Sequence, residues 1–339
     1  MKKLITGATG FIGSAIVREL IKEGEEVKVF LRKTSNTRNI DSLDVERAYG
    51  DIRDGDSMKR ALKGCDTLYL TAAYFAHWAP DPKVLYEVNV GGTRASLKAA
   101  FEAGIEKVVY TSTNNAIAAS GPVPADEEKA FNYWEARDHY SMSKYIAENE
   151  ARIFAMRGLP LVMVNPTLVI GVNDIKPTPS GQMMIDVVNQ KMPGYIDGGI
   201  NIIDVEDVAR GHILAAKKGR VGERYLLGNR NITVHDYLKL IADIAGVRPP
   251  AVKLPYHLAL ALGHLFELGA FITKKPPVVT ASEVRIARMM EWYDCSKAVN
   301  ELGLPQTPID VTIRKALNWF KENGYLRNER GECGDASPR

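Results

Sequence analysis

The chain has 339 residues, of which 45% are apolar and 25% charged, and its formal net charge is +3. This length suits one large domain or two joined ones with a substantial core, and so small a charge argues against a nucleic-acid or polyacidic partner. Cys65, Cys295 and Cys333 have neither disulfide nor metal-ligand spacing. We therefore expect no metal site, no secretory signal and a reducing, cytoplasmic location.

The stretch "TGATGFIG", residues 6–13, follows an apolar strand-like segment and opens an amphipathic helical one. Strand, glycine turn and helix in this order are typical of a turn that binds a dinucleotide pyrophosphate. Gly7 permits the tight turn, Gly10 lets the backbone approach the phosphates, and Gly13 allows close helix–strand packing. A purely structural glycine turn is the alternative. The residues predicted to contact the cofactor here are Gly7, Thr9, Gly10, Phe11, Ile12 and Gly13.

The second strand-like run, 27–31, is followed by Arg32 and Lys33, with no acidic residue before Asp41. In NAD-specific turns an acidic side chain binds the ribose 2′-hydroxyl, whereas arginine accommodates a 2′-phosphate. Arg32 therefore favours NADP over NAD, although it could also be an ordinary surface cation. NAD stays open as a second cofactor.

Further strand-like runs at 45–49, 67–70, 108–112 and 161–165 alternate with amphipathic segments that end at glycine. Continuous apolar strands separated by helices indicate a parallel sheet covered on both faces. The fold class is therefore α/β, with a doubly wound parallel Rossmann sheet over residues 1–165 as the dinucleotide-binding domain.

The segments "VVYTST" at 108–113 and "YSMSK" at 140–144 combine a strand end rich in hydroxyls with a Tyr/Lys pair. Tyr140 and Lys144 are four residues apart, so they share one face of a helix. A nearby ammonium would lower the pKa of the phenol and make Tyr140 a general acid/base. A surface Tyr/Lys pair is the alternative.

Beyond Pro166 the pattern becomes irregular, and we predict a smaller, mainly helical, discontinuous substrate domain over 166–328. The run "NIIDVEDVARGHILAA" has strand-then-helix character, so 201–228 is expected to rejoin the sheet. The last residues, 329–339, have the composition of a solvated tail.

The stretch 254–272, "LPYHLALALGHLFELGAFI", is apolar and long, but His257, His264 and Glu267 interrupt it. We predict a mostly buried helix packed on the rest of the protein. A subunit contact in a homodimer and a lipid-facing lid are the alternatives, so a membrane contact at 254–272 stays open.

With "GDIRD" and "NVGGT", these motifs resemble the extended short-chain dehydrogenase/reductase superfamily, or NAD-dependent epimerases/dehydratases. Within it the chain is similar to dihydroflavonol-4-reductase-like proteins and to the hopanoid-associated sugar epimerase group. The resemblance extends to about residue 327. It implies the cofactor contacts Arg32, Asp51, Ile52, Thr71, Ala72, Ala73, Tyr140, Lys144 and Pro166.

The resemblance also implies a catalytic set of Thr113, Tyr140 and Lys144, with Lys144 reaching the nicotinamide ribose and Asn89 in a structural role. Two departures from the family pattern concern the substrate end. "LYLTAA" lacks a histidine that often precedes the two alanines, and "TSTNNAIAAS" puts Asn114 and Asn115 near the expected substrate. His77, in the aromatic loop "YFAHWAPDP", is expected to be a hydrogen-bonded loop residue rather than a catalytic helper.

The favoured function is an NADP(H)-dependent reductase of a ketone or aldehyde on a moderately apolar molecule. The first alternative is a nucleotide-sugar epimerase that holds NAD(P) tightly and oxidises the sugar transiently. A redox sensor that binds NADP without turnover is the second, although it would not need the proton chemistry of Tyr140 and Lys144.

Overall fold

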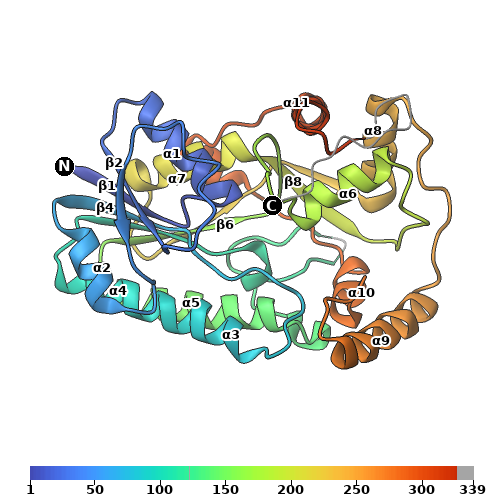
Figure 1. Ribbon diagram of the computed structural model, residues 1–339, viewed down its shortest axis with the longest axis horizontal. Helices are drawn as coiled ribbons and strands as arrows, with labels where there is room; N and C mark the ends of the chain where they lie inside the picture. The colour runs from blue at the N-terminus through green and yellow to red at the C-terminus, as the bar shows by residue number, and fades with distance from the viewer. Residues whose placement is uncertain (122, 327–339) are drawn as a thin grey trace.

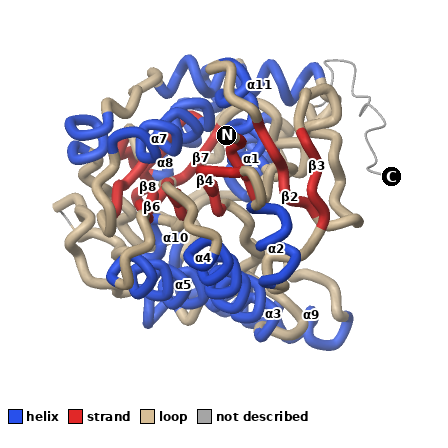
Figure 2. Tube along the Cα trace, turned by 90° about the vertical axis from the view of Figure 1, so that its left-hand side faces the viewer, coloured by secondary structure: helices blue, strands red, loops and turns tan. Residues whose placement is uncertain are grey.

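A computed structural model describes residues 1–121 and 123–326 of the chain. Its main body is a parallel sheet of seven strands in the order β3-β2-β1-β4-β5-β6-β9, and Figure 2 shows the strands between layers of helices. The strands are β1 (Lys2–Thr6), β2 (Val27–Leu31), β3 (Glu46–Tyr49), β4 (Cys65–Leu70), β5 (Lys107–Thr111), β6 (Leu161–Pro166) and β9 (Arg224–Leu227).

Helices cover both faces of this sheet, as the apolar strands require. Helices α1 (Phe11–Lys22) and α7 (Val205–Lys218) pack together on one face. On the other lie α2 (Gly55–Leu62), α4 (Gly92–Glu102) and α5 (His139–Met156) (Figure 1). Strand alternation feeds two separate cores: Leu4 packs in the cluster under α2, α4 and α5, and its neighbour Ile5 in the cluster under α1 and α7.

A second, smaller sheet has the order β10-β8-β7, with β7 and β8 parallel and β8 and β10 antiparallel. Its strands are β7 (Leu168–Ile170), β8 (Gly199–Asp204) and β10 (Arg230–Thr233). A third apolar core joins this sheet to helices α6, α8 and α11. The remaining helices are α3 (Lys83–Tyr86), α6 (Pro179–Val188), α8 (Val234–Ala245), α9 (Tyr256–Thr273), α10 (Ala281–Ala287) and α11 (Ile309–Glu322).

The strand expected to rejoin the main sheet near residue 201 does not do so. It forms β8, which pairs with β7 and β10, and only α7 and β9 return to the main sheet. The reason is that the chain leaves β6 and continues into β7, which offers β8 a parallel edge outside the main sheet. The domain boundary at 165/166 stays a prediction, and the predicted tail 329–339 and Cys333 lie outside the described residues.

The apolar segment 254–272 also differs from its prediction. It forms α9, in which only Ala259, Gly263 and Ala270 are buried. The prediction of a mostly buried helix was therefore wrong. By length and composition alone, α9 is also long and apolar enough to cross a membrane. The buried face is narrow because it consists of alanine and glycine, which let α9 pack close to α10. Most of the leucines of α9 lie on its exposed face.

Candidate functional site

The sheet places a crevice where the strand order reverses, between β1 and β4. Ligands of doubly wound sheets bind at such a point, beyond the carboxyl ends of the strands. A cavity of about 810 Å³ lies there and continues toward the small sheet. Every residue that the sequence assigned to catalysis or to the cofactor lines this cavity, so one pocket brings together segments from residue 7 to residue 166.

The glycine turn at the end of β1 leaves no room for side chains at two positions. Gly7 has a φ of +67°, and a Cβ there would lie 2.9 Å from the backbone of Ala72. A Cβ on Gly13 would lie 2.2 Å from the carbonyl oxygen of Gly7. Gly10 caps α1 without a side-chain hydrogen bond, so the first N–H groups of α1 keep no side-chain acceptor. This bare, positively polarised helix end fits a phosphate group.

We call the end of the pocket beside the glycine turn 7–13 the nucleotide end. It also carries two guanidinium groups, those of Arg32 and Arg53. Arg32 directly follows β2, is exposed and, within the described part of the chain, forms no ion pair. Arg53 instead holds Asp51 through two hydrogen bonds, of 3.0 Å from Nε and 2.8 Å from Nη2. That contact lowers the pKa of Asp51 against the opposing effect of burial. Arg32 is therefore the cation left free to meet a ligand here, and Ser35 beside it is a lining residue that the sequence did not single out.

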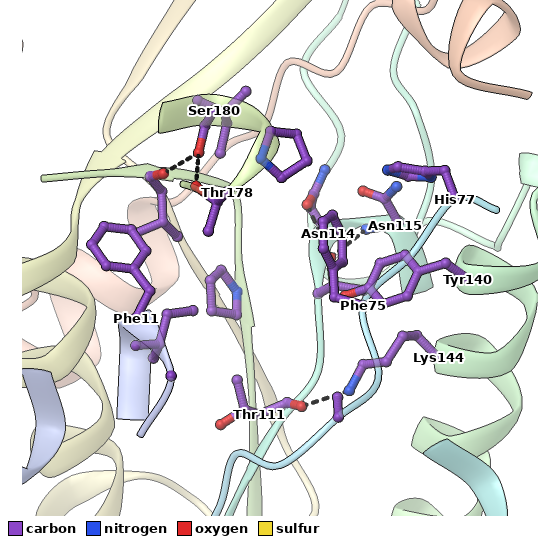
Figure 3. Close-up of a pocket in the computed structure, with 18 of the residues that line it drawn as sticks. Phe11, Phe75, His77, Thr111, Asn114, Asn115, Tyr140, Lys144, Thr178 and Ser180 are labelled. Atoms are coloured by element: carbon purple, nitrogen blue, oxygen red, sulfur yellow. Dashed lines mark hydrogen bonds between the residues drawn. The ribbon is translucent and has the colours of Figure 1, made fainter. Parts of the chain in front are cut away.

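The Tyr/Lys pair lies on the first turns of α5, with both side chains buried in the pocket wall (Figure 3). Lys144 Nζ donates to the carbonyl oxygen of Thr111 at 2.8 Å and to the hydroxyl of Tyr110 at 3.2 Å. Burial lowers the pKa of Lys144 to about 8, although Glu148 opposes this. Burial raises the pKa of Tyr140, and Asp138 adds to the rise.

The expected lowering of the Tyr140 pKa by Lys144 is therefore absent. The ammonium is turned toward β5 rather than toward the phenol, and burial outweighs the hydrogen bond with Thr113 that favours the phenolate. Tyr140 is thus a neutral phenol near pH 7, which can donate a proton.

Two hydroxyls follow β5 at the pocket wall. Thr113 Oγ1 donates to Asn114 Oδ1 at 3.2 Å and accepts from the backbone N–H of Asn115 at 3.3 Å. Ser112 Oγ is buried and has no hydrogen-bond partner among the described residues. Of these two hydroxyls, that of Thr113 acts on Tyr140, because it opposes the rise of the Tyr140 pKa. It is also the hydroxyl that the family resemblance implied.

The loop after β4 is fixed to α5 by two side chains. Asn89 accepts from the backbone N–H of Tyr74 at 2.7 Å and donates to Ser143 Oγ at 2.9 Å, which agrees with its predicted structural role. His77 Nδ1 lies 3.0 Å from Asp138 Oδ1, as a hydrogen-bonded loop histidine should. Burial disfavours the charged form of His77, but the bond to Asp138 outweighs it and raises the pKa.

Phe75, from the same loop, meets the ring of Tyr140 edge to face, with centroids 4.6 Å apart. Figure 3 shows Phe75, Tyr140 and Lys144 on one side of the pocket, with Phe11, Thr178 and Ser180 on the other. Tyr140 and Lys144 thus lie beside the aromatic loop and across the pocket from Phe11, at the end of the glycine turn.

Glu291, which sequence reasoning missed, enters the pocket from the segment after α10. Its carboxylate accepts from the hydroxyl of Tyr133 at 2.5 Å and from Asn114 Nδ2 at 3.3 Å. Burial raises the pKa of Glu291 to about 7. Asn114 is thus oriented by a residue 177 positions away. No local motif marks the stretch "MMEWYD", so only the fold reveals this contact.

The far end of the pocket is apolar. It is built by α6, α8, the stretch before α9, and α10, which are distant in sequence but meet beside the small sheet. The apolar residues that line it include Met183, Met192, Tyr195, Val234, Leu238, Leu254 and Ile286.

This geometry agrees with the relatives of the chain. The model of the NAD dependent epimerase/dehydratase family matches residues 3–228. The chain belongs to this family. Its members bind NAD(P), and the relatives of the chain include reductases, so the chain is placed among the extended short-chain oxidoreductases and epimerases.

Three relatives match nearly the whole chain. A Synechocystis sp. protein named "Putative dihydroflavonol 4-reductase" is 38% identical, over 96% of each chain. Sterol demethylase protein B of Methylococcus capsulatus is 32% identical, over 96% of this chain and 100% of its own. The crystal structure of gox2253 has a TM-score of 0.85 and 39% identity, covering 96% of this chain and 99% of that one.

Proposed function

We propose that this family member is an NADP(H)-dependent reductase of a ketone or aldehyde carried by an apolar molecule. The observation that carries the proposal is how charge is distributed along the pocket. Among the described lining residues, the only lysines and arginines are Arg32 and Arg53 at the nucleotide end and Lys144 beside Tyr140. The apolar far end has none.

The nucleotide end supports NADP. An exposed Arg32 with no ion pair to any described residue suits the dianionic 2′-phosphate, because a guanidinium donates two hydrogen bonds to such a group. The carboxylate of Asp51 is already held by Arg53 and does not stand at the end of β2, where an NAD-binding acid would be.

The far end supports an apolar carbonyl compound over a nucleotide sugar. A nucleotide sugar brings a diphosphate, which proteins usually meet with arginine, lysine or a helix N-terminus. The described lining at this end has no lysine or arginine, and it includes Glu283 and Glu291 among apolar side chains. The N-terminus of α6 also lies here, but the Thr178 side chain already caps it by accepting from the backbone N–H of Gly181. Relatives named as a dihydroflavonol reductase and a sterol demethylase protein point the same way.

In this proposal the bound cofactor supplies the hydride, and the chain supplies the proton and the orientation. The neutral phenol of Tyr140 donates its proton to the carbonyl oxygen as negative charge develops on it. The Thr113 hydroxyl hydrogen-bonds the same oxygen and favours the phenolate that remains, while Lys144 would bind the nicotinamide ribose. Asp138 fixes the start of α5 by accepting from the backbone N–H of Ser141 at 2.8 Å, which orients Tyr140. Solvent then returns the proton to Tyr140.

The cofactor assignment is tested by titrating NADPH and NADH into the wild type and Arg32→Ala. We expect NADPH to bind more tightly, and Arg32→Ala to cost about 1.5–3 kcal/mol for NADPH and little for NADH, because a charge-assisted contact is lost. Lys33→Ala is the matched control, since Lys33 is also exposed but does not line the pocket. Equal wild-type affinities for the two cofactors would contradict the assignment.

The reaction is tested by supplying NADPH with a panel of apolar ketones and aldehydes. Oxidation of NADPH in step with alcohol formation is expected. Interconversion of a nucleotide sugar without net NADPH loss would instead establish the epimerase. Absence of both activities with intact NADPH binding would favour the redox sensor.

A further inference from the structure

Helix α9 exposes an apolar surface at one end of the molecule, at the lower right in Figure 1. Its side chains include Leu265, Leu268, Phe271 and Ile272, which are 61%, 59%, 70% and 74% exposed. Leu258 and Leu262 of the same helix, and Val278 after it, are exposed as well. Contiguous exposed apolar side chains on this scale usually mark a contact surface.

The attachment of α9 accounts for this exposure. A Cβ on Gly263 would lie 3.0 Å from the backbone of Ala281, so the helices touch where α9 has no side chain. Glu267, the single acidic residue of α9, turns inward and accepts from the backbone N–H of Ala281 at 2.9 Å. The one carboxylate of the helix thus caps α10 and leaves the outer face without negative charge.

Positive charge surrounds this apolar face. Residues 248–288 contain six Lys/Arg and two Glu, a net charge of +4; since the whole chain carries +3, the rest has −1. Lys274 and Lys275 follow α9 and are exposed, whereas Lys253, which precedes it, is paired with Asp197. Arg288 lies over the ring of Tyr256 at the start of the helix, 4.6 Å from its centroid. Apolar area and cationic ends therefore belong to one surface.

We propose that α9 docks this surface on an anionic lipid bilayer, lying in the plane of the interface. Apolar side chains on a helix flanked by lysines are the chemistry that binds acidic headgroups and the acyl boundary together. A spanning orientation does not fit, because Gly263 and Glu267 tie the helix to α10. A second copy fits less well, since a two-fold pairing of antiparallel helices would bring Lys274 and Lys275 toward Arg288 at the start of the other copy's helix.

Docking also bears on the substrate, and this step rests on the proposed function. Leu254, two residues before α9, and Ile286 of α10 line the apolar end of the pocket. The segment that enters α9 and the helix on which α9 packs thus both line the substrate region. The substrate class that follows is a carbonyl compound dissolved in the membrane.

The docking is tested by flotation of the full chain with phosphatidylglycerol-containing vesicles and with pure phosphatidylcholine vesicles, without substrate. We expect binding to the anionic vesicles, at least tenfold weaker binding to the neutral ones, and weakening by salt. The double change Leu265→Asp/Leu268→Asp should reduce anionic binding at least tenfold. Met156→Asp is the control, because Met156 is 80% exposed on α5, away from α9.

The charge contribution is tested by Lys274→Glu/Lys275→Glu against Lys63→Glu/Lys129→Glu, an equal charge change at exposed lysines outside the surface. Only the first pair should weaken anionic binding. Equal weakening by both pairs, or no vesicle binding by the wild type, would overturn the proposal. Self-association that Leu265→Asp/Leu268→Asp abolishes, without vesicle binding, would assign the face to a second copy. NADPH affinity is measured on each variant as well. Unchanged NADPH affinity together with lost vesicle binding would show that the docking can fail or hold independently of the proposed function.

Discussion

The two ends of the pocket are built in different ways. The nucleotide end comes mainly from short segments that follow consecutive strands of one sheet, such as the turn 7–13, Arg32 and 71–73. The substrate end combines the loop after β4 with α6, α8, α10 and Glu291, which are separated by up to about two hundred residues. The nucleotide end is lined mainly by backbone groups beside the N-terminus of α1. The substrate end is lined mainly by side chains, many of them from elements that pack in the apolar core of the small sheet.

From this difference we infer that backbone geometry governs cofactor binding at the first end, and that side-chain identity governs substrate binding at the second. Backbone groups and glycines leave little freedom at the nucleotide end, because even one Cβ would collide there. At the substrate end, side chains can change without disturbing the sheet. Changes at one end should therefore leave the function of the other end intact, and the following variants test this.

The largest effect is expected from Tyr140→Phe, at the junction of the two ends. The ring and its contact with Phe75 remain, but the transferable proton is gone, so turnover should fall roughly 10²-fold or more while NADPH affinity is retained. Tyr145→Phe is a control on the same helix, since Tyr145 stacks on Phe131 and does not line the pocket. Steady-state kinetics and cofactor titration check both. Near-normal turnover of Tyr140→Phe would move the proton donor elsewhere, with His77 the next candidate.

Gly13→Ala should disrupt the nucleotide end specifically. The new Cβ would lie 2.2 Å from the Gly7 carbonyl oxygen, so the turn must shift and cofactor affinity should fall about tenfold or more, with a loss of about 1–3 kcal/mol in the free energy of unfolding. Gly55→Ala is the control, because its Cβ would have no neighbour closer than 3.9 Å. Calorimetric titration with NADPH and thermal unfolding measure the two effects. If Gly13→Ala bound NADPH as the wild type does, the rigid-backbone account of this end would be wrong.

The smallest effect is expected for Glu291→Gln, which should change the pH dependence of the substrate KM and leave NADPH affinity nearly unchanged. The wild-type carboxyl, with a pKa of about 7, is neutral below that pH and charged above it. An ionised carboxylate beside an apolar ligand is unfavourable, so the wild-type KM should rise severalfold from pH 6 to pH 8, and that of Glu291→Gln should not. NADPH affinity should change less than twofold. Glu127→Gln, at a buried acid outside the pocket, should keep the wild-type profile. The same KM–pH profile in Glu291→Gln and the wild type would remove Glu291 from the substrate site.

Much of the nucleotide end could be predicted because its signals are local. The spacing of Gly7, Gly10 and Gly13 reflects the sterics of one turn, and the apolar runs mark strands that are buried on both faces. Tyr140 and Lys144 were recognisable for the same reason, since one helix turn sets their relation. Their roles remain predictions that the variants above test.

Other features could not be predicted because they depend on distant partners. The pKa of Tyr140 rises because burial dominates and Lys144 is turned toward Thr111, and neither effect is visible in "YSMSK". The strand 199–204 pairs with β7 because β7 provides an edge outside the main sheet. Helix α9 was expected to be buried because its composition is apolar, but composition does not say which face meets a neighbour.

The sequence by itself determined the parallel sheet, the phosphate-type turn and the residue types available for proton transfer, since these follow from periodicity, glycine spacing and one helical turn. Only the tertiary structure decided the environment of those residues. It brought Glu291 to Asn114, left Arg32 without an ion pair to the rest of the described chain, and attached α9 through Gly263 so that most of its leucines stay exposed. The physical reason is that charge, burial and exposure are set by contacts between segments far apart in the chain, whereas the elements themselves are set by neighbours within a few residues.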